Sequence, residues 1–421
     1  MTGDELRREV CDEVRDEVRD EVREWLRTTW DPELSLVAWR RRLMDAGWIV
    51  PSWPVDCYGR GLPSWADAVV QEELDAVGAP GAPFGGGMTL AAPTLVAHAS
   101  AELQRSLLPV TLTGEVTWTQ LFSEPGSGSD LAGLTTRADH DGDEWVVNGQ
   151  KLWNTSAHHA DLGMLVARTD WDVPKHAGIT YFVLPMAQPG VEARPLRQMN
   201  GHASFNEVFL TDARIPATHV VGDVGDGWRV ARTTLMHERG FATMRKPRVG
   251  RVLGRAISEA AAEADEHFRT YEWYPQRAGR ADLAVEAART MGADDDPVVR
   301  HGIAALVSLQ RANEWTAKRA AVARALRRAP GPEGSLGKLA ASEVARRSSR
   351  VHASIVGAAG MLTGPSSPLG GVIAEVLVST PAQSIAGGTD EIQRNIVGER
   401  VLGLPGEPAV DKGVPFCDVR R

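Results

Sequence analysis

The chain has 421 residues, of which 43% are hydrophobic and 24% are charged, and its formal net charge is -9. This length exceeds the size at which one hydrophobic core stops growing, so two or three domains are expected in a globular rather than a disordered protein. The negative charge argues against a nucleic-acid partner, because phosphate binding requires a concentrated basic face.

Helical patterns fill the N-terminal part of the chain. Residues 9–24 repeat Glu-Val-Arg-Asp, so valines four residues apart form a narrow apolar stripe among paired charges. This pattern predicts a charged helix docked on a domain. Further helices are predicted over 36–48, over 64–77 with Ser64 as the cap and a glycine at the end, and over 94–110.

From about residue 116 the pattern changes to short apolar runs rich in β-branched and aromatic residues. Asp-Gly and Asn-Gly pairs between some of these runs are typical of tight hairpins, so an antiparallel β domain is predicted. The main runs are 118–122, 145–147, 162–167, 179–184 and 207–210.

After residue 227 the strand signals stop, and Ala/Leu/Arg-rich helical patterns extend to about residue 400. Residues 271–297 are rich in Asp, Gly and Arg and predict a long surface excursion, whereas 357–371 predict a loop between two helices. The fold class is therefore α+β. The predicted parts are an N-terminal helical domain over 1–115, a β domain over 116–222, a helical bundle over 223–404 and a loose tail over 405–421.

Several classes of protein are disfavoured by what the sequence lacks. The three cysteines, Cys11, Cys57 and Cys417, have no metal or redox spacing, and no HExxH pattern is present, so we expect no metal site. The GxGxxG, GxSxG and GxxxxGK[ST] patterns are also missing. No apolar run is long enough for a membrane span, and no signal region opens the chain, so we expect a cytoplasmic location.

Two segments, about 260 residues apart, carry most of the functional information. Residues 121–130 read Leu-Phe-Ser-Glu-Pro-Gly-Ser-Gly-Ser-Asp, a turn whose small residues free backbone N–H groups to face a ligand. Residues 387–394 read Gly-Gly-Thr-Asp-Glu-Ile-Gln-Arg and open a predicted helix with Thr389 as its cap. Either turn alone is weak evidence of a site, but together they indicate a flavin enzyme.

With both segments and the run 147–153, the chain resembles the acyl-CoA dehydrogenase family over most of its length. The resemblance implies an α-helical domain, a middle β-barrel domain and a C-terminal four-helix bundle. It also implies bound FAD, an acyl-CoA substrate, an electron-transfer flavoprotein as acceptor and a dimeric or tetrameric assembly.

The resemblance also assigns roles to individual residues. Trp153 would pack beside the isoalloxazine ring, Thr155 would hydrogen-bond near its N5 atom, and Ser123 would lie on the pyrimidine side. Ser129 matches the position against the pantetheine arm of the substrate, and Arg239 a second substrate contact. The FAD contacts implied are Leu121, Ser123, Gly128, Trp153, Thr155, Thr389 and Glu391.

The catalytic base is the point at which this chain departs from many relatives. Many members carry the base as the first residue of a Glu-Gly-Thr triplet, but the matching triplet here begins with Gly387. Another branch supplies it from an earlier helix in a Glu-Arg pair, which corresponds to Glu238-Arg239. We therefore expect Glu238 to be the base and the backbone N–H of Gly387 to help bind the thioester oxygen. The alternative for Glu238 is an ordinary solvated helical glutamate.

A second departure bears on assembly. The Arg-x-x-Phe-Gly motif that usually reaches the FAD pyrophosphate is missing, so Arg300 or a partner subunit would have to replace it. Two other functions thus stay open: a non-catalytic or half-site subunit of a heteromeric dehydrogenase, and a flavin oxidase or monooxygenase on the same fold.

Overall fold

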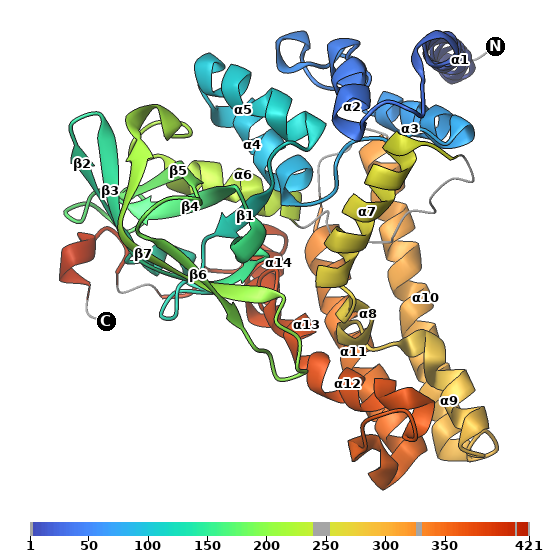
Figure 1. Ribbon diagram of the computed structural model, residues 1–421. Coiled ribbons are helices and arrows are strands. Elements are labelled where there is room, and N and C mark those ends of the chain that lie inside the picture. Colours follow the sequence, from blue (N-terminus) through green and yellow to red (C-terminus); the bar gives the residue numbers. More distant parts are fainter. Residues whose placement is uncertain (1–2, 239–252, 326–330, 409–410, 420–421) are drawn as a thin grey trace. The chain divides into compact units, whose positions relative to one another are not determined.

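The computed structural model describes residues 3–238, 253–325, 331–408 and 411–419. Figure 1 draws them as a ribbon coloured along the sequence. By their contacts they form two compact units. The first unit comprises Met1–Pro195, Phe205–Thr270 and Gly413–Arg421, and the second comprises Leu196–Ser204 and Tyr271–Lys412.

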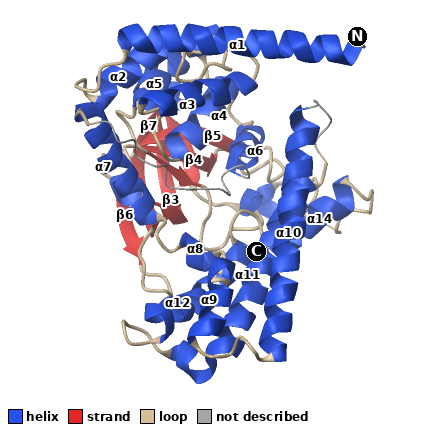
Figure 2. Cartoon of the chain, turned by 90° about the vertical axis from the view of Figure 1, so that its right-hand side faces the viewer, coloured by secondary structure: helices blue, strands red, loops and turns tan. Residues whose placement is uncertain are grey.

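Helices of the first unit pack over its sheet, whose strands are red in Figure 2. Helix α1 is docked on the unit, as the sequence predicted, and its partner is α3. Val18 and Val22 are buried there, and Arg19 bonds to Glu73 at 2.6 Å. The helices are α1 (Gly3–Thr29), α2 (Leu36–Asp45), α3 (Trp65–Val77), α4 (Ala92–His98), α5 (Ala101–Thr113), α6 (Gly227–Glu238) and α7 (Arg255–Thr270).

Two details of these helices differ from the sequence predictions. The helix predicted over 94–110 is broken, because Ala99 is extended and the Ser100 hydroxyl caps a new helix by accepting from the Leu103 N–H at 3.2 Å. Ser64 begins α3 without a side-chain capping bond, whereas Gly78 ends it in the left-handed conformation as predicted.

The middle sheet has seven strands in the order β1-β4-β2-β3-β7-β6, with β5 paired to β4. It is curled, but it is not antiparallel throughout: β1 runs parallel to β4, with Trp118 opposite Leu162. Alternate residues of β4 and β5 face the helices and the sheet interior, so both strands are buried on two sides. The strands are β1 (Trp118–Leu121), β2 (Arg137–Asp141), β3 (Glu144–Thr155), β4 (Leu162–Arg168), β5 (Ile179–Pro185), β6 (Val191–Leu196) and β7 (Phe205–Pro216).

The second unit is built from helices. Residues 271–297 are not the surface excursion that the sequence predicted, because they contain two helices and Trp273 and Ala287 are buried. Small alanines allow α9 to approach α11 closely. The helices are α8 (Tyr274–Arg277), α9 (Ala284–Thr290), α10 (Pro297–Ala325), α11 (Glu333–Val356), α12 (Val372–Ser379), α13 (Pro381–Ile385) and α14 (Asp390–Arg400).

The predicted loose tail contains a docked segment, because residues 413–419 pack on the first unit. Phe416 is buried, its N–H donates to the Val173 carbonyl at 2.9 Å, and the Cys417 N–H donates to the Trp171 carbonyl at 2.9 Å. The Arg168 guanidinium lies 3.4 Å from the centre of the Phe416 ring. Phe416 and Cys417 therefore pack against the segment that follows β4 of the middle sheet.

One described stretch, Pro368–Arg400, is long and apolar enough to cross a membrane by length and composition alone. It consists of separate short helices, because Gly387 and Gly388 adopt φ values of +68° and +81° between α13 and α14. Each helix is shorter than the about 20 residues that a membrane span requires.

Candidate active site

The glycine-rich turn begins where β1 ends. Leu121 is buried in the sheet interior, and the carbonyl of half-buried Ser123 accepts the Leu152 N–H at 2.8 Å. Glu124 and Ser127 exchange two backbone hydrogen bonds of 2.9 and 3.0 Å, which close a tight turn. A Cβ atom at Gly128 would meet nothing within 4 Å, so the outer side of the turn is open to a ligand.

A buried ion pair between Glu124 and Lys151 fixes this turn to the sheet. Glu124 accepts from the Lys151 ammonium at 2.9 Å and from the backbone N–H groups of Thr135 and Thr136 at 2.7 and 2.8 Å. Lys151 is fully buried and also donates to the Phe122 carbonyl at 3.1 Å. The turn and β3 are thereby fixed to each other. Sequence reasoning missed this pair, although Lys151 lies within a segment that carries the family resemblance.

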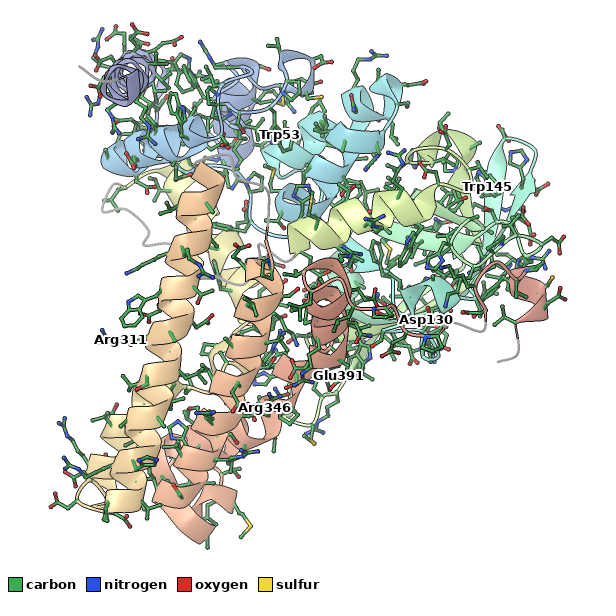
Figure 3. All side chains as sticks on the ribbon, turned by 180° about the vertical axis from the view of Figure 1, so that it is seen from behind. Trp53, Asp130, Trp145, Arg311, Arg346 and Glu391 are labelled. Atoms are coloured by element: carbon green, nitrogen blue, oxygen red, sulfur yellow. The ribbon has the colours of Figure 1, made fainter. Side chains whose placement is uncertain are left out.

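The far end of the turn is fixed by a second set of contacts. Asp130, labelled in Figure 3, accepts from the Lys175 ammonium at 2.9 Å, while the adjacent Ser129 is exposed. Arg168 donates to the carbonyls of Ala132 and Leu134 at 2.7 and 3.2 Å. Arg168 also lies against Phe416. Its side chain therefore connects residues 132 and 134, just beyond the turn, with the docked segment near residue 416.

Trp153 stands out from β3 in an unusual backbone conformation. The pairing of β3 with β7 shifts register between Leu152 and Asn154, and at this bulge Trp153 has φ +63°. Its side chain is 54% exposed and touches Phe205 edge-on, with ring centres 5.8 Å apart. An exposed indole held in a left-handed position is a flat apolar surface suited to a ring ligand.

Replacing Trp153 by glycine should separate ligand binding from stability. Glycine accepts a positive φ freely, which offsets the lost contact with Phe205, so the unfolding free energy of the apoprotein should change by less than about 1 kcal/mol. FAD retention should fall sharply. Thermal unfolding and fluorescence titration with FAD measure the two effects.

The matched control is Trp145→Ala in the same strand. Trp145 is buried against Phe182, and emptying its place should cost about 3–5 kcal/mol. If Trp153→Gly destabilised the apoprotein as much as Trp145→Ala, Trp153 would be an ordinary packing residue.

Glu238, the predicted base, ends the described part of α6. It is half-buried, and its Oε2 atom accepts a hydrogen bond from the Gln120 amide at 3.4 Å. Gln120 lies on β1 directly before Leu121, so the carboxylate is next to the strand that leads into the glycine-rich turn.

Arg239 lies outside the described residues. Thr155 lies at the end of β3, where its carbonyl accepts from the Thr119 hydroxyl at 2.9 Å.

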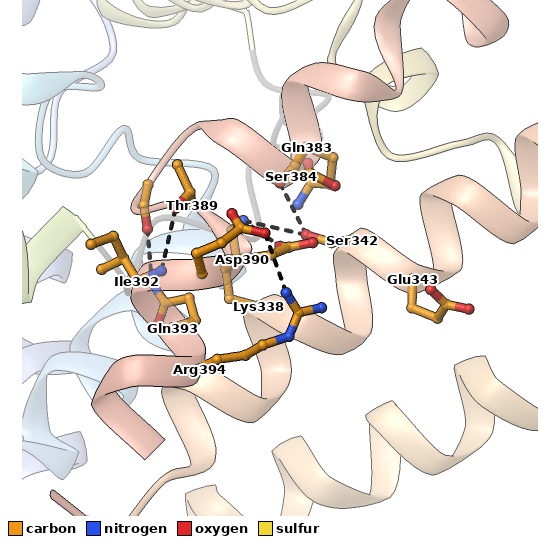
Figure 4. A network of polar contacts seen from close by, with 12 residues as sticks. Lys338, Ser342, Glu343, Gln383, Ser384, Thr389, Asp390, Ile392, Gln393 and Arg394 are labelled. Atoms are coloured by element: carbon orange, nitrogen blue, oxygen red, sulfur yellow. Dashed lines mark hydrogen bonds and ion pairs between the residues drawn. The ribbon is translucent and has the colours of Figure 1, made fainter. Parts of the chain in front are cut away.

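The second glycine-containing turn, residues 387–391, belongs to the second unit (Figure 4). Both glycines have left-handed φ, and the buried Gln393 amide donates to the Gly387 carbonyl at 3.1 Å. The Thr389 hydroxyl caps α14 by accepting from the Ile392 N–H, as the sequence predicted. Glu391 is exposed beside Arg394.

Asp390 connects this turn to α11. Its carboxylate is buried and accepts from Lys338 at 2.9 Å and from Arg346 at 2.6 Å, while Arg346 also bonds to Ser384 at 2.8 Å. Burial opposes ionisation, but these cations outweigh it and hold the pKa of Asp390 well below its usual range. No local signal predicts this cluster, because Lys338 and Arg346 resemble ordinary helical cations in the sequence.

Asp390→Ala should destabilise the second unit by roughly 2–3 kcal/mol. Removing one partner leaves two cations side by side, and the cost stays below the 3–5 kcal/mol of a fully buried pair because Arg346 is 35% exposed. Urea unfolding of the apoprotein measures the change. Glu391→Ala, on the exposed neighbour, is the control and should have almost no effect; equal losses in both variants would contradict the structural role of Asp390.

The residue suggested as a substitute for the missing pyrophosphate arginine is also located. Arg300 lies in the first turn of α10, is 67% exposed and donates to the Asp294 carbonyl at 3.3 Å. Its role toward FAD stays a prediction.

Among the residues that the structure describes, no three potential metal ligands cluster.

Comparisons with known proteins agree with this architecture. Models of the acyl-CoA dehydrogenase N-terminal, middle and C-terminal domains match residues 2–115, 119–213 and 277–402. Acyl-CoA dehydrogenase IpdE1 of Mycobacterium tuberculosis is 38% identical over 88% of each chain. Acyl-CoA dehydrogenase FadE34 of the same organism is 35% identical over 86% of this chain and 45% of its own length.

Solved structures give the same result. The Tcur3481-Tcur3483 steroid ACAD superposes with a TM-score of 0.65 and 26% identity, covering 94% of this chain and 98% of its own. The ChsE4-ChsE5 complex from Mycobacterium tuberculosis has a TM-score of 0.63 and 26% identity, covering 93% of this chain and 98% of its own. This chain, with its three matched domains, belongs to the acyl-CoA dehydrogenase family and is a flavin-dependent oxidoreductase.

Proposed function

We propose that this chain catalyses α,β-dehydrogenation of an acyl-CoA thioester to the 2-enoyl-CoA, with Glu238 as the base. The observation that carries the proposal is the placement of the Glu238 carboxylate beside Gln120 on β1, next to the glycine-rich turn. Bound FAD would accept the hydride from the β carbon. Glu238 takes the proton from the α carbon, and the electron pair of that C–H bond forms the new double bond.

The described residues fit a flavin on the first unit. Ser123 and Gly128 present an open turn, and Trp153 presents an exposed indole from the bulge in β3. Leu121 supports the turn from the sheet interior, and Thr155 lies two residues beyond the indole. Ser129, exposed at the outer end of the turn, is suited to the pantetheine arm. The roles proposed for Gly387, Thr389 and Glu391 toward oxyanion and adenosine stay predictions.

A glutamate that acts as a base must be deprotonated before it reacts. Contact with an apolar substrate removes water from a carboxylate, and this desolvation raises its pKa above the solution value of about 4.3. A carboxylate with a raised pKa is a stronger base near neutral pH. A well-placed general base contributes roughly 10²–10⁴-fold in rate.

The substrate class proposed is a bulky acyl-CoA such as one with a steroid ring system. One related solved structure is a steroid ACAD, and this chain resembles it over most of its length. The Tcur3481-Tcur3483 steroid ACAD and the ChsE4-ChsE5 complex are each named for two proteins, which supports an assembly of this chain with a homologous subunit. An electron-transfer flavoprotein as acceptor and a cytoplasmic location also stay predictions.

Anaerobic mixing with acyl-CoA tests the proposal directly. The purified protein should be yellow, and its visible absorbance should bleach faster with an acyl-CoA that carries a steroid ring system than with butyryl-CoA. A colourless protein that binds FAD only after a homologous chain is added would support the half-site subunit instead. Rapid reoxidation of the reduced protein by oxygen would support the oxidase.

A further inference from the structure

A chain of side-chain amides crosses the first unit and ends at Glu238. The side-chain amide of Asn206 on β7 donates to the backbone carbonyl of Asn154 at 2.9 Å, and the side-chain amide of Asn154 on β3 donates to the backbone carbonyl of Gln120 at 2.7 Å. The Gln120 amide on β1 then donates to Glu238 at 3.4 Å. Four elements that are distant in sequence are thus linked.

The two asparagines stabilise the backbone where the sheet is irregular. Both are buried, and Asn154 directly follows Trp153 at the bulge, where the regular ladder between β3 and β7 is interrupted. Their amides supply hydrogen bonds across the strands at this point. Gln120 is also paired with Met164 of β4. Its backbone is therefore held on two sides, which limits where its side chain can reach.

A carboxylate accepts hydrogen bonds but cannot donate them, so the Gln120 amide must present its N–H to ionised Glu238. The resulting bond orients one oxygen of the carboxylate. It also favours the ionised form over the protonated form, which can no longer accept as strongly. A length of 3.4 Å is long, and hydrogen bonds of catalytic groups commonly tighten when substrate excludes water.

We propose that Gln120 is a positioning residue that orients the Glu238 carboxylate and keeps it ionised at working pH. The inference rests on the proposed role of Glu238 as the base. It assigns a specific task to a side chain for which neither the sequence motifs nor the comparisons supply one.

Other ionisable groups on and against α6 bond to residues of α6 other than Glu238, among them Arg229, which bonds to His98 at 3.1 Å. His98 on α4 bonds to Thr233 at 2.7 Å, and Tyr181 on β5 bonds to Thr234 at 3.2 Å. His237 precedes Glu238 on the same helix, and burial lowers its pKa. The hydrogen bonds of His98 and Tyr181 do not involve Gln120, so substitution of Gln120 removes neither of them.

Two substitutions of nearly the same length test the proposal. Gln120→Met removes the donor, and Gln120→Glu replaces it with a second carboxylate. The rate of flavin bleaching in anaerobic single turnovers is measured against pH. The acid limb of the profile should move to higher pH in the order wild type, Gln120→Met, Gln120→Glu, because losing a donor and then adding a like charge each disfavour ionisation. At pH 7 the Gln120→Met rate should fall about tenfold or more.

Gln150→Met is the matched control. Gln150 lies on β3 and also donates to a glutamate, Glu207, but not to Glu238. Its profile should coincide with that of wild type. FAD content and acyl-CoA affinity should stay unchanged in all variants, since a merely structural role would alter them.

The outcomes separate this inference from the proposed function. If Gln120→Met bleached with an unshifted acid limb, or lost its FAD, the positioning role would be overturned while Glu238 could still be the base. If Glu238→Gln bleached normally, the proposed function itself would fail.

Discussion

Replacing Glu238 by glutamine should slow the reduction of bound flavin by acyl-CoA roughly 10²–10⁴-fold, with FAD still bound. Glutamine keeps the size of the side chain and its contact with Gln120 but cannot take a proton at working pH. The loss should appear in the limiting rate of bleaching rather than in substrate affinity, because the proton moves only in the chemical step.

Stopped-flow absorbance under anaerobic conditions measures this rate, and Glu72→Gln is the control. Glu72 is an exposed helical glutamate on α3 that pairs with Arg19, so its replacement should leave bleaching unchanged. Bleaching of Glu238→Gln at the wild-type rate would show that the base lies elsewhere and that Glu238 is an ordinary solvated residue.

Lys151→Met should lower the free energy of unfolding by about 3–5 kcal/mol. The substitution leaves the buried Glu124 carboxylate without its cation, which is far more costly than removing both charges. In the double variant Glu124→Gln/Lys151→Met most of the loss should be recovered. Denaturant unfolding of the apoprotein compares the three proteins. A double variant as unstable as Lys151→Met would contradict the ion-pair explanation.

The same pair predicts how stability depends on pH. Burial opposes ionisation of Glu124, but Lys151 and the Thr135 and Thr136 contacts outweigh it and lower the pKa of Glu124 to about 2. A depressed carboxyl pKa stabilises the fold above the pKa of the unfolded chain, about 4.3, and this contribution is lost as pH falls toward 2. Between pH 6 and pH 3 wild type should therefore lose more unfolding free energy than Glu124→Gln/Lys151→Met.

Local patterns predicted the elements but not their long-range pairing. The valine repeat correctly indicated α1, and Gly78 and Thr389 correctly marked helix ends, because these signals act within one or two turns. The parallel pairing of β1 with β4 depends on residues 44 apart, for which the sequence has no short-range signal. The helices α8 and α9 were missed because the Asp, Gly and Arg residues of 271–297 are typical of an exposed loop.

The site shows the same division. The glycine-rich turn and Trp153 could be located from the sequence, since their residue types are unusual. Glu124–Lys151 and the cations around Asp390 could not, because such pairs form only when distant segments meet. Gln120 was missed for the same reason: it is an ordinary residue in a strand, and its significance comes from the helix end beside it.

The contacts of residues 416 and 417 also bear on the order of folding. Cys417 contacts Asp172 across 245 residues of sequence, and the Phe416 ring lies against the Arg168 guanidinium. Contacts between segments so distant in sequence form late, because a long loop must close before they are made. We therefore expect this side of the sheet to stay uncovered until residues 416 and 417 have been synthesised, although its strands are made much earlier.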